Sequence, residues 1–150
     1  MRGGGSFFVD TNVLLYSVDP SEQLKREQAW KWLAELWEHG RGRVSWQVLH
    51  EFYVNATRKK GLAGGRAREM VRGYAQWTPV EVTLGLLEGA WLWADQAQVP
   101  YWDALIVAAA ERAGCQWLLS EDFQDGRRFG SVTVVNPLLH PPQSFGLASK

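Results

Sequence analysis

Three short apolar runs constrain the fold of this chain more than any other feature of its sequence. They are Phe7-Phe8-Val9, Trp117-Leu118-Leu119 and Val132-Thr133-Val134-Val135. Runs of this kind are typical of strands buried on both faces of a sheet, and helical patterns fill the long interval between the first run and the second. This alternation predicts an α/β fold, with a mainly parallel central sheet covered by helices on both faces.

The helical patterns carry their own start and stop signals. Ser45 and Thr83 stand where N-caps would begin helices, and Pro100 suits a first helical turn because its missing N–H would be unpaired there. Gly40 ends the longest pattern. Helices are therefore expected over residues 23–39, from Ser45 toward Gly61, and over 66–76, 83–96 and 100–113, with further short strands at 43–45 and 79–82.

The length and composition predict one soluble domain. The chain has 150 residues, of which 46% are hydrophobic, and this is enough apolar material for one core over about residues 7–138. The glycine-rich start and the tail from Pro141 are expected to be flexible. Cys115 is the only cysteine, so no intrachain disulfide forms, and it reads as a small buried hydrophobe. Without a signal peptide or an apolar stretch long enough to span a bilayer, a cytoplasmic location is expected, with no membrane partner.

The charges are balanced overall but unevenly distributed. Sixteen basic and sixteen acidic residues give a formal net charge of zero, which indicates no partner. One locally basic segment can face a phosphate backbone, although a solvated helix face explains any single charge run more simply. Its members are Arg58, Lys59, Lys60, Arg66, Arg68 and Arg72.

Four acidic residues fall where they can meet. Asp10 and Asp122 come at or just after the carboxyl ends of two expected strands, where α/β folds bind ligands. Asp103 lies in the first turn of one expected helix and Glu51 lies inside another. Carboxylates brought together repel one another unless a cation or protons neutralise them. Oxygen ligands suit Mg²⁺ or Mn²⁺, and such a site can activate water for phosphodiester cleavage.

Four motifs together resemble those of PIN-domain toxins of the VapC type. The resemblance covers roughly residues 7–138, and four motifs in one order are far more specific than any one of them. The motifs are FVDTNVL at 8–14, the helical Glu51, YWDALIVAAA at 101–110 and LSEDFQDG at 119–126.

The resemblance implies a PIN-like α/β/α sandwich and Mg²⁺- or Mn²⁺-dependent cleavage of RNA. Asp10, Glu51, Asp103 and Asp122 match the family's acidic quartet, with Asp10, Asp103 and Asp122 as the metal ligands. Asn12 and Ser120 match auxiliary polar positions, and Asp125 is a candidate auxiliary acid. Tyr101 departs from the pattern, because a small hydroxyl residue is frequent at that place. Toxin–antitoxin membership further implies a homodimer and a cognate antitoxin protein laid across the active-site groove.

Simpler interpretations stand beside these. Asp10 alone could end a strand, Asp103 alone could favour the positive end of a helix dipole, and Glu51 alone could be solvated. Asp125 followed by Gly126 is an ordinary turn pair, which is the favoured interpretation of Asp125.

The nine tryptophans divide between core and surface. Most are expected to lie in the core or at partner contacts, although some could form a base-stacking platform. Trp32 and Trp93 fall off the main apolar faces of their helices, which makes them candidates for an oligomer or antitoxin surface.

Other functions remain open at this stage. An aspartyl phosphatase would use Asp10 as a nucleophile, but it would typically carry an acid where Asn12 stands. A PIN nuclease of RNA maturation shares the same site. A non-catalytic PIN scaffold that binds RNA or protein would be expected to have lost one of the four acids, and none is missing.

Overall fold

The central sheet of the computed structural model, which describes residues 5–147, has five short strands. They are β1 (Phe7–Val9), β2 (Gly42–Arg43), β3 (Trp117–Leu119), β4 (Arg128–Phe129) and β5 (Val132–Val135). Their order across the sheet is β2-β1-β3-β5-β4, and each neighbouring pair is parallel except β4 with β5. The prediction of a mainly parallel sheet is confirmed.

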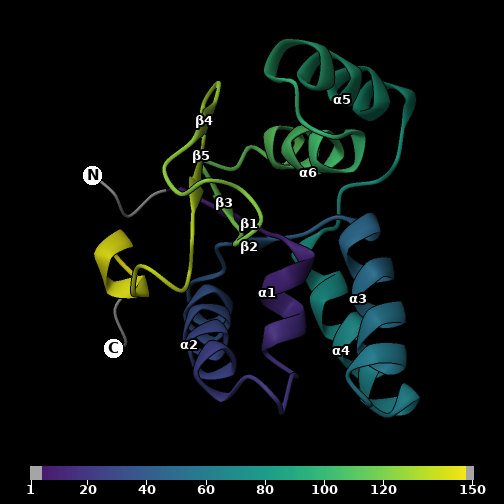
Figure 1. Ribbon diagram of the computed structural model, residues 1–150, viewed down its shortest axis with the longest axis vertical. Coiled ribbons are helices and arrows are strands. Elements are labelled where there is room, and N and C mark those ends of the chain that lie inside the picture. The colour runs from purple at the N-terminus through teal and green to yellow at the C-terminus, as the bar shows by residue number, and fades with distance from the viewer. Residues whose placement is uncertain (1–4, 148–150) are drawn as a thin grey trace.

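Helices cover both faces of this sheet. In Figure 1, α5 and α6 lie on one side and α1 to α4 on the other, which confirms the predicted three layers. The helices are α1 (Thr11–Tyr16), α2 (Gln23–His39), α3 (Trp46–Lys59), α4 (Gly64–Tyr74), α5 (Leu84–Ala97) and α6 (Tyr101–Arg112), with 3₁₀ turns η2 (Ala75–Trp77) and η3 (Pro142–Phe145). None of them, among the described residues, is long and apolar enough to cross a membrane.

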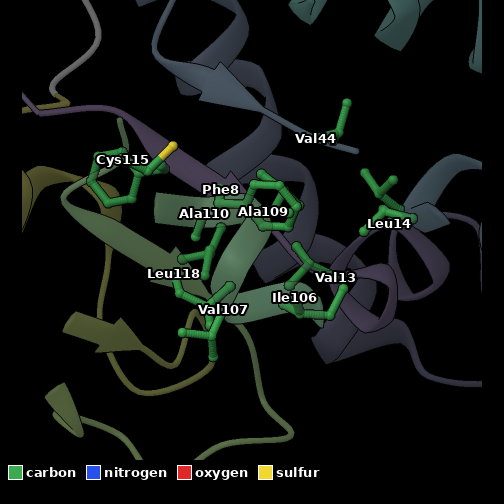
Figure 2. Close-up of a cluster of buried hydrophobic side chains, with 14 of the residues drawn as sticks. Phe8, Val13, Leu14, Val44, Ile106, Val107, Ala109, Ala110, Cys115 and Leu118 are labelled. Carbon is green, nitrogen blue, oxygen red and sulfur yellow. The ribbon is translucent and has the colours of Figure 1, made fainter. Parts of the chain in front are cut away.

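The core is centred on β1, β3 and α6. Every residue from Ala104 to Ala110 is buried, because α6 lies between the sheet and α5 and therefore has no solvent face over this stretch. Figure 2 shows Ile106 and Val107 of α6 gathered with Phe8 and Leu118 of the two central strands. Cys115 is buried as expected.

The local signals in the sequence begin and end the helices as expected. The side chains of Ser45 and Thr83 accept hydrogen bonds from the N–H groups of Val48 and Leu86, each at 3.2 Å. Gly40 ends α2 in the left-handed conformation, with φ of 65°. The strand expected at 79–82 is reduced to a single bridge between Val80 and Ser45.

The buried face of α2 differs from the predicted one. Trp32, expected on the surface, is fully buried between Phe7 and Phe145, and its indole N–H donates to the carbonyl of His140 at 2.9 Å. The apolar spacing of residues 24–37 predicts the helix, but it does not predict the buried face: Ala29 and Leu33 are buried, whereas Leu24, Trp30, Ala34 and Trp37 are exposed. The buried face differs because the aromatic partners of Trp32 come from distant parts of the chain.

Trp93 is also held by contacts within the fold instead of standing free on the surface. Its ring packs edge-on against Phe129 with centroids 5.5 Å apart. Its indole N–H donates to the carboxylate of Glu111. The interpretation as a partner surface is therefore wrong for Trp32, which is buried, and it stays a prediction for Trp93, which is partly buried.

The C-terminal segment belongs to the core, which corrects the prediction that the core ends near residue 138 and that a flexible tail starts at Pro141. Phe145 of η3 packs against Phe7 and Trp117, and Leu147 is fully buried. Burial of these apolar side chains orders a stretch that was expected to be flexible because it holds few large apolar residues. The rest of that tail, residues 148–150, and residues 1–4 of the glycine-rich start lie outside the described residues.

Candidate active site

Asp10 is at the carboxyl end of β1 and at the start of α1. Its backbone N–H continues the sheet by donating to the carbonyl of Leu119 at 3.0 Å. Its side chain then caps α1, where Oδ1 accepts the N–H of Thr11 at 2.8 Å. The carboxylate is 6% exposed and is fixed at the meeting point of β1, β3 and α1.

A hydrogen-bond network from β3 holds the other oxygen of Asp10. The hydroxyl of Ser120 donates to Oδ2 at 2.7 Å, and Nδ2 of Asn12 donates to the same oxygen at 3.2 Å. Asn12 also accepts the backbone N–H of Glu121 at 3.1 Å, and Ser120 Oγ accepts that of Asp122 at 3.0 Å. Asn12 and Ser120 therefore tie the loop carrying Asp122 to the end of β1.

Glu51 reaches the same place from α3. Its Oε1 accepts the hydroxyl of Thr11 at 2.9 Å, and Thr11 is the residue whose N–H bonds to Asp10. Sequence reasoning did not single out Thr11, although it stands inside the first motif. The only signal for it was its place beside Asp10.

Asp103 and Asp122 complete the acidic group. Asp103 lies in the first turn of α6 and is partly buried, whereas Asp122 is exposed in the loop after β3. The charges of Asp122 and Glu51 act on both Asp10 and Asp103. The four predicted acids, which are far apart in sequence, are thus brought within electrostatic reach of one another.

Burial without a counter-charge changes the acidity of this group. Burial raises the pKa of Asp10 from 3.8 to about 7, the bonds from Ser120 and Thr11 lower it in part, and the charges of Asp122 and Glu51 raise it further. The pKa of Asp103 is raised for the same reasons, burial first and then the charges of Asp122 and Glu51. The site is short of positive charge, and a bound cation would restore the ionised carboxylates.

The donor set fits a hard divalent cation. Carboxylate oxygens from Asp10, Asp103 and Asp122 are ligands that Mg²⁺ and Mn²⁺ prefer. Within residues 5–147, no three Asp, Glu, His or Cys side chains stand close enough to coordinate one ion as they are. Asp10 is fixed by its hydrogen bonds, whereas Asp103 is only partly buried and Asp122 is exposed.

Asp125 is engaged elsewhere. Its carboxylate accepts the backbone N–H of Asn136 at 2.8 Å and lies 2.8 Å from Nε2 of His140. Partial burial raises its pKa, but the bonds from His140 and Asn136 outweigh burial and leave the pKa lowered. These contacts fasten the segment after β5, in keeping with a structural role.

The basic segment is divided in space. Arg58 and Lys59 lie in the last turn of α3, about 20 Å along the helix from its start. Lys60 is engaged with Asp19, its Nζ 2.8 Å from Oδ2. These three residues therefore lie at the opposite end of α3 from the residues that follow Ser45.

The other three basic residues lie on α4. Arg66 pairs with Glu69 on the surface at 3.3 Å. Arg68 donates to the hydroxyl of Tyr53 at 3.2 Å, and Arg72 lies one turn further along the helix. Figure 1 shows α4 running back along α3, and Arg72 lines a pocket together with Trp46, the first residue of α3.

A contact group missed by sequence reasoning anchors the loop after β3 from the other side. The hydroxyl of Tyr16 bonds to the carboxylate of Glu121. Lys25 lies 3.5 Å from the same carboxylate and 4.7 Å from the centre of the Tyr16 ring. Glu121 directly precedes Asp122, so this cluster helps to fix the backbone that carries Asp122.

Comparison with known proteins places this arrangement in one family. The model of the PIN domain family matches residues 7–127. This range is most of the chain and includes all four acids, so the chain belongs to the PIN domain family. No curated protein sequence matches it.

Solved structures share the fold at low sequence identity. One is a toxin–antitoxin complex from Klebsiella pneumoniae, with a TM-score of 0.61, 16% identity, and coverage of 88% of this chain and 98% of that one. Another is VapC20 of Mycobacterium tuberculosis, a toxin that cleaves the sarcin-ricin loop, with a TM-score of 0.54, 23% identity, and coverage of 78% and 92%. At these identities the similarity concerns the fold.

Proposed function

We propose that this chain is a divalent-metal-dependent endoribonuclease that acts as the toxin of a toxin–antitoxin pair. The observation that carries the proposal is the buried Asp10 on a PIN-domain fold, whose pKa is raised because it is buried and because its charged neighbours are the acids Asp122 and Glu51. A carboxylate kept in this state costs folding free energy. A bound Mg²⁺ or Mn²⁺ would offset that cost.

The residues of the site would divide the work. Asp10, Asp103 and Asp122 would hold the cation, which when bound would activate a water and stabilise the oxygen that leaves the phosphodiester. Glu51, bonded to Thr11, would accept a proton from the attacking water. Asn12 and Ser120 would keep Asp10 and the Asp122 loop in place.

The fold neighbours support the toxin part of the proposal. One is a toxin–antitoxin complex and the other an RNA-cleaving toxin, and this chain covers nearly the whole of each. By this analogy the substrate is an RNA and the partner is a cognate antitoxin. We further propose, from the resemblance of the four motifs to VapC-type toxins, that the enzyme is a homodimer and acts in the cytoplasm.

Cleavage of labelled nucleic acids by the purified protein tests this function. A structured RNA and a single-stranded DNA would be incubated with Mg²⁺, Mn²⁺ or EDTA, beside the Asp10→Asn variant. We expect cleavage of the RNA only, in the presence of metal, and none by the variant. RNA cleavage that persists in EDTA or in Asp10→Asn would contradict the metal-centred site, and a folded protein that binds RNA but cuts none would point to a scaffold.

A further inference from the structure

A groove runs between α3 and α4. It has a volume of about 490 Å³. One wall is formed by Trp46, His50 and Tyr53, whose spacing places them on a single face of α3. The opposite wall carries Arg68 and Arg72, one turn apart on α4.

The groove offers flat apolar surface for a planar ring. Trp46 is 42% exposed, although it directly follows the cap of α3 and its helix is otherwise well packed. The ring of Tyr53 is held from the other side, because its hydroxyl accepts the guanidinium N–H of Arg68 at 3.2 Å. Leu49 and Val71 add apolar surface to the lining. Aromatic side chains in such a setting stack on nucleobases of any sequence.

Positive charge without a carboxylate partner lies along the same groove. Arg68 and Arg72 are exposed, and among residues 5–147 neither lies within 4 Å of an acidic side chain. Of the other cations of the basic segment, Lys60 pairs with Asp19 and Arg66 pairs with Glu69, whereas Arg58 and Lys59 are exposed at the far end of α3. The positive charge that lies beside the aromatic wall is therefore that of Arg68 and Arg72.

The groove lies on a face of α3 that neighbours the face carrying Glu51, although none of the four acids lines it. His50, which lines it, precedes Glu51, whose side chain is bonded to Thr11 on the neighbouring face of α3. A strand of nucleic acid lying in the groove would thus continue toward Asp10. Trp46 lies at the same end of α3 as this exit.

We propose that the α3–α4 groove binds one nucleotide of a single-stranded RNA segment next to the cleaved bond. Its base stacks on Trp46 and Tyr53, and its phosphate lies at Arg68 and Arg72. This inference rests on the proposed ribonuclease function and names where the substrate is held. It assigns RNA binding to Arg68 and Arg72 and not to Arg58, Lys59 and Lys60.

Anisotropy of a labelled single-stranded RNA decamer tests the groove without cleavage. The full-length protein in EDTA would be compared with Trp46→Leu and with a double variant, Arg68→Gln with Arg72→Gln. Matched controls are Trp91→Leu, an equally exposed tryptophan on α5, and a double variant, Arg58→Gln with Lys59→Gln, on the far end of α3. Thermal melting of each protein confirms that it is folded.

We expect Trp46→Leu to weaken RNA binding about tenfold, as loss of one stacked base does. The Arg68/Arg72 double variant should weaken it and reduce the slope of log affinity against log salt by about 1.4, for two phosphate contacts to a single strand. The controls should bind like the parent. If all variants bind RNA equally and metal-dependent cleavage of the same RNA is intact, the proposed role of the groove is wrong, whereas the proposed ribonuclease function stands. A parent protein that neither binds nor cleaves RNA would overturn both.

Discussion

Two buried aspartates, one at the start of α1 and one just after its end, show how differently the same side chain behaves in this fold. Asp10 is 6% exposed and Asp19 is 2% exposed. The pKa of Asp10 is raised to about 7 by burial, whereas that of Asp19 is lowered to about 2 by Lys60 and Ser21. Both side chains have little contact with water, but burial is the main cause of the pKa shift at Asp10 and a lesser one at Asp19, where the bonds from Lys60 and Ser21 come first. The difference therefore lies in the depth of burial and in the counter-charge that the chain supplies.

The comparison separates a structural acid from a candidate functional one. Asp19 has Lys60 at 2.8 Å and two bonds from Ser21, so its charge is already neutralised within the chain. Asp10 receives neutral donors only, and its charged neighbours are acids. A protein keeps such an unbalanced group at a cost to stability, which is typical of a site whose missing charge comes from a ligand.

The largest expected effect is on the rate of RNA cleavage, which should fall when Asp10 is replaced but not when Asp19 is replaced. We expect Asp10→Asn and Asp103→Asn to lower RNA cleavage by roughly 100-fold or more, because each removes a charge that would hold the cation. Asp19→Asn should cleave at close to the parent rate. A single-turnover assay at saturating Mg²⁺ measures this, and equal losses in all three variants would erase the distinction.

The second largest expected effect is on the free energy of unfolding, when the ion pair between Lys60 and Asp19 is broken. Removing the cation with Lys60→Met leaves the Asp19 carboxylate buried, and we expect a loss of about 1–2 kcal/mol in the free energy of unfolding near pH 7. Because the pKa of Asp19 is lowered in the folded state, its contribution is present above pH 3.8 and is lost as the pH falls toward 2. Urea unfolding at pH 7 and pH 3 should therefore show a smaller gap between parent and variant at pH 3.

The contribution of Asp10 to stability should depend on pH in the opposite direction to that of Asp19. Protonated Asp10 stabilises the fold fully below pH 3.8, and this contribution is lost as the pH rises through about 7. Asp10→Asn in EDTA should then be more stable than the parent at pH 8, by about 1–2 kcal/mol, since some of the shift is offset by weaker bonds to Ser120 and Asn12. The stability difference between Asp10→Asn and the parent should shrink toward pH 4. If the variant is less stable than the parent at pH 8, Asp10 has a structural role instead.

Thr11 should show the smallest effect. Thr11→Val removes the hydroxyl that holds Glu51, and we expect kcat to fall about tenfold with KM nearly unchanged, as for loss of a positioning contact. Thr11→Ser keeps the hydroxyl and should restore most of the rate. If both variants behave alike, the bond between Thr11 and Glu51 has no part in positioning.

Much of the framework could be predicted from the sequence because its signals are local. The apolar runs of β1 and β3, the Ser45 and Thr83 caps and the glycine stop of α2 each depend on a few neighbouring residues. The six-residue α1 is too short to show a helical period, and it was missed.

The misses depend on contacts between distant parts of the chain. Burial of Trp32 depends on Phe7 and Phe145, and the tail is fixed because Phe145 and Leu147 pack into the core. No periodicity can report such pairs.

The candidate site divides in the same way. The four acids were selected by motif and order, and the fold brings their charges together. The bond between Thr11 and Glu51 and the pair of Lys60 with Asp19 could not be read from spacing, because each joins residues about forty positions apart. The pair also explains why Lys60, which adjoins other basic residues in the sequence, is engaged within the fold.

Calorimetric titration of Mn²⁺ into the parent, Asp10→Asn and Asp19→Asn tests the central claim most directly, because it needs no substrate. If Asp10 marks a cation site and Asp19 a finished ion pair, the parent and Asp19→Asn should bind Mn²⁺ alike, and Asp10→Asn should bind it at least about tenfold more weakly. Equal binding by Asp10→Asn and the parent, with both folded, would contradict the account.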